Sequence, residues 1–153
     1  MNPTAVGRFS RLGPEIASLR QNVGMTKTAE YQPGVCNIGP AEIRRRRMSG
    51  WVGLAVAVGF LILAFALGWA APWRLLVALP VFLSAQGFLQ AAFHFCVGFA
   101  SRGLYNFGAL GSEETVHEAE FRRKDQRKAL LITVLAFAIA AVVAVVAYLI
   151  PIG

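Results

Sequence analysis

Charge is missing from three long stretches of this sequence. Residues 51–71, 75–100 and 129–150 contain no Lys, Arg, Asp or Glu, although the 153-residue chain has 15 basic and 8 acidic side chains. Helices that pack in a soluble core normally keep one polar face, so charge-free stretches of this length argue against a soluble bundle. At about 1.5 Å per residue, each can cross the roughly 30 Å of bilayer hydrocarbon. The sequence therefore predicts an all-α integral membrane protein with three transmembrane helices.

Cysteine is scarce, and the common catalytic motifs are missing. Cys36 and Cys96 are the only two cysteines and form no CxxC pair; no HExxH motif or glycine-rich phosphate loop occurs. His117 lies near Glu113 and Glu114, a pattern that a solvated helix surface explains better than a metal site. We therefore expect no enzymatic activity, no metal and no cofactor.

Basic residues give the chain a net charge of +7, which by itself could indicate nucleic-acid binding. Their positions argue for the membrane instead. Five basic residues precede the third stretch, and four precede the first: Arg44, Arg45, Arg46 and Arg47. Such juxtamembrane positions carry topology signals and contacts with anionic lipids. We expect the lipid bilayer as a partner and no nucleic acid, with the four arginines either fixing topology or forming a lipid-facing basic cluster.

The distribution of Lys and Arg predicts an orientation. Residues 1–50 contain eight of them, the turn after the first stretch only Arg74, residues 101–128 six, and the C-terminus none. Loops rich in Lys and Arg stay in the cytoplasm. We therefore expect a cytoplasmic N-terminus and an external C-terminus.

Three regions follow from these patterns. We expect a cytoplasmic arm over residues 1–39, a two-helix membrane domain over 40–108, and a linker helix with the third span over 109–153. Pro40 suits the first position of a helix. Ser112 suits an N-cap, so the linker helix is predicted to begin there and to run into the third span.

Small residues recur four apart in the first and third stretches, which lets neighbouring helices approach closely. The pairs include Gly53 with Ala57 and Ala55 with Gly59, and the third stretch has Ala136, Ala140 and Ala144. They favour a homo-oligomer or membership of a larger membrane complex.

The second stretch alone has several polar side chains. Gln86, Gln90 and His94 are four apart and would share one helix face. Because polar groups facing lipid are costly, this face should point at another helix or at a hydrated cavity. Two interpretations remain: hydrogen bonds that join the helices, or a polar path in which His94 titrates.

Both cysteines fall near the expected cytoplasmic surface, where the reducing environment argues against a structural disulfide. Cys96 is two residues from His94, and a nearby histidine can activate a thiol. Side chains two apart on a helix point about 200° apart, however, so direct contact is not expected. Cys96 is thus either a small packing residue or a sulfur-handling thiol.

Several short segments carry a family resemblance: Asn37-Ile38-Gly39, then Glu42-Ile43-Arg44-Arg45, then Gly50-Trp51-Val52-Gly53-Leu54-Ala55. With a second helix that ends at Cys96, residues 36–108 resemble the YgaP-like transmembrane domain family. Val97 follows the cysteine where the family often has proline, and the third stretch lies outside the family pattern.

The resemblance implies a bacterial inner-membrane location and, in some family members, sulfur handling. Our leading expectation is a small inner-membrane protein that oligomerises or serves as an accessory subunit. The alternative is transport or thiol chemistry on the polar face of the second span, with Cys96 or Cys36 as the thiol.

Overall fold

The structure is a computed structural model that describes residues 31–151. Most of the expected cytoplasmic arm, residues 1–30, lies outside the described residues. The elements are, in chain order, α2 (Pro40–Ala66), α3 (Ala71–Arg74), the 3-10 helix η1 (Leu75–Val77), α4 (Ala78–Ala92), α5 (Val97–Arg102), β1 (Leu104–Tyr105), β2 (Glu114–Thr115) and α6 (Ala119–Leu149).

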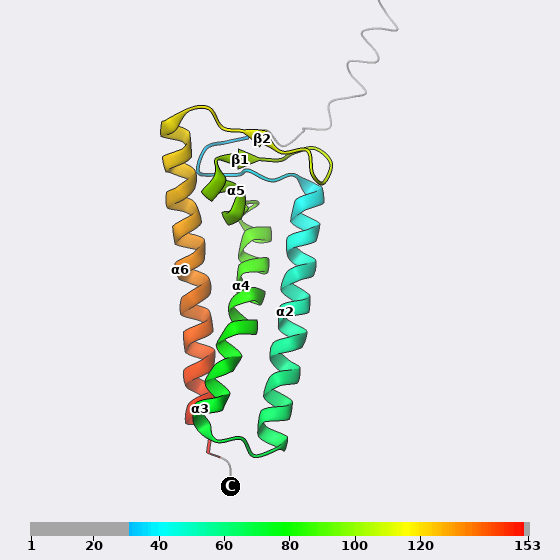
Figure 1. Ribbon diagram of the computed structural model, residues 1–153, viewed down its shortest axis with the longest axis vertical. Coiled ribbons are helices and arrows are strands. Elements are labelled where there is room, and N and C mark those ends of the chain that lie inside the picture. The colour runs from blue at the N-terminus through cyan, green and yellow to red at the C-terminus, as the bar shows by residue number, and fades with distance from the viewer. Residues whose placement is uncertain (1–30, 152–153) are drawn as a thin grey trace, which may run out of the picture.

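Three helical segments are long and apolar enough to cross a membrane: Pro40–Ala66, Ala71–Ala92 and Ala119–Leu149. This confirms the predicted all-α architecture with three spans. In Figure 1, α4 lies between α2 and α6, so the three spans form one layer of helices. At one end a cap holds α5 and the antiparallel pair β1–β2, and at the other end lie α3 and the last turn of α6.

Glycines bring α2 and α4 into close contact. A Cβ on Gly87 would lie 2.5 Å from the Gly50 nitrogen, and one on Gly53 would lie 2.7 Å from the Ser84 nitrogen. The Ser84 hydroxyl also donates to the Gly50 carbonyl at 2.9 Å. Of the small residues predicted to mark packing seams, Gly53 therefore serves a contact within the chain.

Alanines line the inner side of α6, whereas its large side chains point outward. The buried residues of this helix include Ala129, Ala136, Ala140, Ala144 and Ala147. Phe137, by contrast, is 68% exposed and Leu149 is 69% exposed. Small residues inside and large apolar residues outside suit a helix whose outer surface is covered by lipid.

The second span ends earlier than predicted. We expected one helix over residues 75–100, but α4 stops at Ala92 and a short α5 begins at Val97. His94, between them, has φ of 51°, in the left-handed region that interrupts a helix.

The predicted helix start at Ser112 is also wrong. Ser112 lies in a turn, where its hydroxyl donates to the Ala109 carbonyl at 2.7 Å. Glu114 and Thr115 then pair with β1, and α6 begins at Ala119. From there α6 is continuous to Leu149, so the linker helix and the third span are one element.

Candidate functional site

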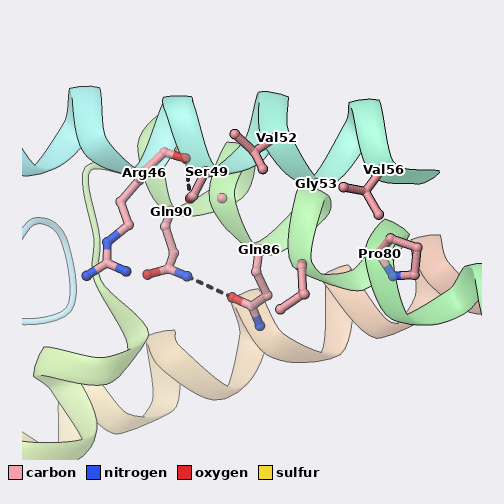
Figure 2. A pocket seen from close by; sticks show the side chains of 10 residues that line it. Arg46, Ser49, Val52, Gly53, Val56, Pro80, Gln86 and Gln90 are labelled. Carbon is pink, nitrogen blue, oxygen red and sulfur yellow. Dashed lines mark hydrogen bonds between the residues drawn. The ribbon is translucent and has the colours of Figure 1, made fainter. Parts of the chain in front are cut away.

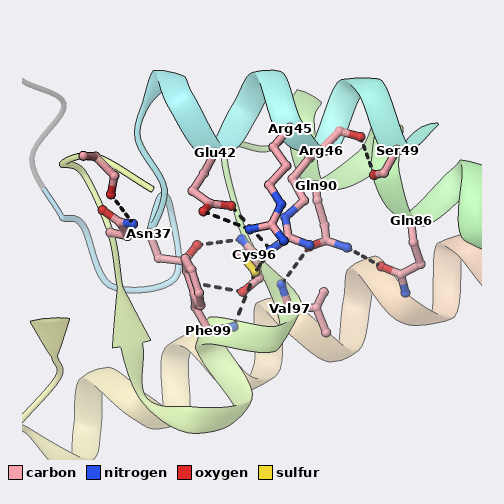
Figure 3. A network of polar contacts seen from close by, with 12 residues as sticks. Asn37, Glu42, Arg45, Arg46, Ser49, Gln86, Gln90, Cys96, Val97 and Phe99 are labelled. Carbon is pink, nitrogen blue, oxygen red and sulfur yellow. Dashed lines mark hydrogen bonds and ion pairs between the residues drawn. The ribbon is translucent and has the colours of Figure 1, made fainter. Parts of the chain in front are cut away.

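Asn37 holds the interruption of the second span in place. Its side-chain NH₂ donates to the Cys96 carbonyl at 3.1 Å, and its side-chain oxygen accepts from the Cys96 N–H at 2.6 Å. The Asn37 N–H donates to the His94 carbonyl at 3.2 Å. Buried backbone groups that the broken helix cannot pair are thus bonded by a residue from before the first span (Figure 3).

Asn37 is itself fixed by Asn106. The Asn106 N–H donates to the Asn37 carbonyl at 2.9 Å, and the Gly39 N–H donates to the Asn106 carbonyl at 2.8 Å. A Cβ on Gly39 would lie 2.9 Å from the Phe107 backbone, so glycine is needed there. The segment before α2 is therefore an integral part of the cap.

Cys96 lies at the centre of this region with 1% of its surface exposed. Its Sγ accepts a hydrogen bond from Arg46 Nη2 at 3.0 Å and one from the Phe99 N–H at 3.4 Å. Burial raises the pKa of the Cys96 thiol, and the Phe99 N–H and the Arg46 charge, which favour the thiolate, do not offset it. The geometry favours a neutral, shielded thiol.

Arg46 joins Cys96 to a buried carboxylate. Glu42 is 2% exposed and lies 3.5 Å from Arg46 Nη2 and 3.7 Å from Arg45 Nη1. Arg44, Arg45 and Arg47 are exposed, whereas Arg46 is partly buried and points toward α4. The basic run, which looked uniform in the sequence, therefore divides into three surface residues and one inward residue.

The two glutamines of the predicted polar face do lie together. Gln90 donates to the Gln86 side-chain oxygen at 3.0 Å, and its own oxygen accepts from the Val97 N–H at 3.2 Å. The predicted row of three is wrong, because His94 lies outside α4 and is exposed. Gln90 thus helps Asn37 to satisfy the helix break.

The remaining predicted residues are Cys36 and His117. Cys36 is half-buried in a turn in which its N–H donates to the Gln32 carbonyl at 3.1 Å. His117 is exposed. Within residues 31–151, no three His, Cys, Asp or Glu side chains are grouped so that they could hold a metal ion.

A groove of about 510 Å³ runs between α2 and α4 beside Arg46. We call it the α2–α4 groove; Figure 2 shows its lining residues. Its polar residues are Arg46, Ser49, Gln86 and Gln90, its apolar side chains are Val52, Val56, Pro80 and Leu83, and Gly53 and Gly87 complete it.

A second buried carboxylate, which the sequence analysis missed, anchors the start of the described chain. Asp125 of α6 is fully buried and accepts from the Tyr31 hydroxyl at 2.9 Å and from the Gly34 N–H at 2.7 Å. Tyr31 also stacks on Tyr105 at 4.7 Å between ring centroids. A lone acid between Arg122 and Lys128 was the available sequence signal.

Comparison of the chain with protein families, curated proteins and solved structures finds no match. The resemblance to the YgaP-like transmembrane domain family stays a prediction.

Proposed function

We propose that this chain is a non-catalytic, multi-pass protein of the bacterial inner membrane that acts as an oligomerising or accessory subunit. The observation that carries the proposal is the use of its polar residues. Gln86, Gln90 and Cys96 all bond to groups of the same chain, and the bonds that reach Cys96 and Val97 hold the helix break. Such a network supports a structural role better than a reaction centre.

The outer face of α2 supports association with another helix. Gly53 and Ala57 are already buried within the chain, whereas Ala55 lies about 200° around the helix from Gly53 and is exposed. A Cβ on Gly59 would have nothing within 4 Å. Because Ala55 and Gly59 are small residues, a second helix can approach α2 closely at this face.

Gly59→Leu tests this proposal, with Ala138→Leu, at an exposed position of α6, as the matched control. We expect cross-linking in native membranes to trap oligomers of the parent and the control and to yield fewer from Gly59→Leu. A parent that is monomeric in membranes and co-purifies with no other subunit would refute the proposal.

A second function, thiol or sulfur handling, is favoured by one contact: Arg46 Nη2 lies 3.0 Å from Cys96 Sγ and would stabilise a thiolate. Burial of Cys96 makes this the weaker candidate. A Cys36→Ser, Cys96→Ser double variant that keeps the cell's full tolerance to sulfide would exclude it.

A further inference from the structure

The α2–α4 groove is polar at one end and apolar along the rest of its length. Its polar end is formed by Arg46, Ser49 and Gln86, and beyond it lie Val52 and Val56 (Figure 2). Leu83 also lines the groove. From Arg46 to Val56 the helix advances by about 15 Å, roughly half the hydrocarbon thickness. The polar end lies toward the cap, so the groove runs from the membrane surface into its apolar interior.

The polar end is positively charged. Between residues 31 and 112, Glu42 is the only acidic residue, and four consecutive arginines, Arg44–Arg47, follow it in the sequence. Glu42 contacts Arg45 and Arg46, so one carboxylate is shared between two guanidinium groups. These two arginines therefore keep a net positive charge, which attracts an anion.

Arg46 supplies hydrogen-bond donors at the polar end. Its side chain is partly exposed, and its Nη2 contacts Glu42 at 3.5 Å and Cys96 Sγ at 3.0 Å. A guanidinium has five N–H donors and no acceptor, so Arg46 suits phosphate oxygens, which only accept hydrogen bonds.

We propose that the α2–α4 groove binds one anionic glycerophospholipid, with its phosphate against Arg46 and an acyl chain along Val52, Val56 and Leu83. The depth of the groove and its charge both favour this occupant. A free anion would use only the polar end. A span of a second copy would bring no negative charge, because the three apolar stretches contain no acidic residue.

Native mass spectrometry of the purified full chain tests the proposal with dioleoylphosphatidylglycerol, which is anionic, and dioleoylphosphatidylcholine, which is zwitterionic. We expect one tightly held phosphatidylglycerol. Arg46→Gln should weaken it by about tenfold, because a charge-assisted contact is lost. Arg47→Gln removes an exposed arginine of the same run and should retain the lipid.

A second pair of variants leaves the contact between Arg46 and Glu42 unchanged. Val56→Trp fills the apolar part of the groove and should displace the lipid. Val58→Trp is the control, because Val58 lines a different face of α2.

Three results would overturn the proposal. The first is equal losses in Arg46→Gln and Arg47→Gln, which would indicate general surface attraction. The second is full retention of the lipid by Val56→Trp. The third is glycerol 3-phosphate binding as tightly as the whole lipid, which would indicate a site for a free anion.

Discussion

The Asn37 side chain stabilises the helix break between α4 and α5. Its side-chain amide has an NH₂ that donates and an oxygen that accepts, and both bond to the backbone of Cys96. A helix interrupted inside an apolar environment leaves backbone groups without partners, each costing about 1–3 kcal/mol. Asn37 removes two of these costs at once.

Asn37→Ala should therefore lower the free energy of unfolding by about 2–4 kcal/mol, since two buried backbone groups lose their partner. Asn37→Asp should lower it at least as much, because a carboxylate oxygen would face the Cys96 carbonyl oxygen and an unpaired charge would be buried. Denaturant titration in detergent measures both. Gln32→Ala, at an exposed position nearby, is the control and should change little.

Cys96 allows a prediction about pH. Its thiol is buried and its pKa is raised, so the reactive thiolate forms only at higher pH than in a free cysteine. In a Cys36→Ser background, alkylation by a maleimide should be slow at neutral pH. Its rate should rise with a midpoint above that of a small-molecule thiol in the same buffer. A midpoint below that of the small thiol would contradict the burial and would revive the sulfur-handling alternative.

At the scale of elements, the sequence predicted what depends on local composition and missed what depends on distant partners. Absence of charge was enough to find all three spans, and Pro40 does begin α2. The end of α4 was not predictable, because residues 92–97 contain neither proline nor glycine. Asn37, which is 59 residues away from Cys96 in the sequence, donates and accepts the hydrogen bonds that stabilise the break.

α6 begins later than its local sequence predicts because the preceding residues pair with β1. Ser112 satisfied the local rule for an N-cap, but Glu114 and Thr115 pair with Tyr105 and Leu104, and the Tyr105 hydroxyl donates to the Glu114 carboxylate at 2.5 Å. The pairing of these two short strands overrides a capping preference of about 1 kcal/mol.

The contact between α2 and α4 gives a prediction with a built-in control. Gly87→Ala would place a Cβ 2.5 Å from the Gly50 nitrogen and 2.8 Å from the Arg46 carbonyl oxygen, which are backbone atoms that cannot turn away. We expect a loss of about 1–3 kcal/mol in unfolding free energy, as for other overpacked contacts. Gly59→Ala meets nothing within 4 Å and should be neutral or slightly stabilising.

Arg74 gives a prediction at the opposite end of the layer. Arg74 is buried, and its Nη1 donates to the carbonyls of Ala147 at 3.0 Å and Ile150 at 2.6 Å, at the negative end of the α6 dipole. Arg74→Ala should lower the free energy of unfolding by about 2–3 kcal/mol and should speed hydrogen exchange in the last turn of α6. Arg102→Ala, at an exposed site, should do neither.

At the scale of the whole molecule, the two ends of the helix layer differ in charge. The described basic residues gather at the cap, except for Arg74 at the far end. That one cation is bonded to the carbonyl oxygens of α6. The asymmetry that predicts a cytoplasmic cap is thus sharper in three dimensions than in the sequence, because the exception has a structural role.

Cysteine labelling from one side of the membrane tests that orientation. Ser112→Cys lies in the cap and Ala70→Cys lies just before α3; both positions are exposed. Cys36→Ser provides the background, and Cys96 stays because it is buried. A membrane-impermeant maleimide should label Ala70→Cys in intact spheroplasts and Ser112→Cys only after lysis, with the background chain unlabelled. The reverse pattern would place the arginine-rich cap outside, against the positive-inside rule, and would remove the support that charge gives to a cytoplasmic N-terminus.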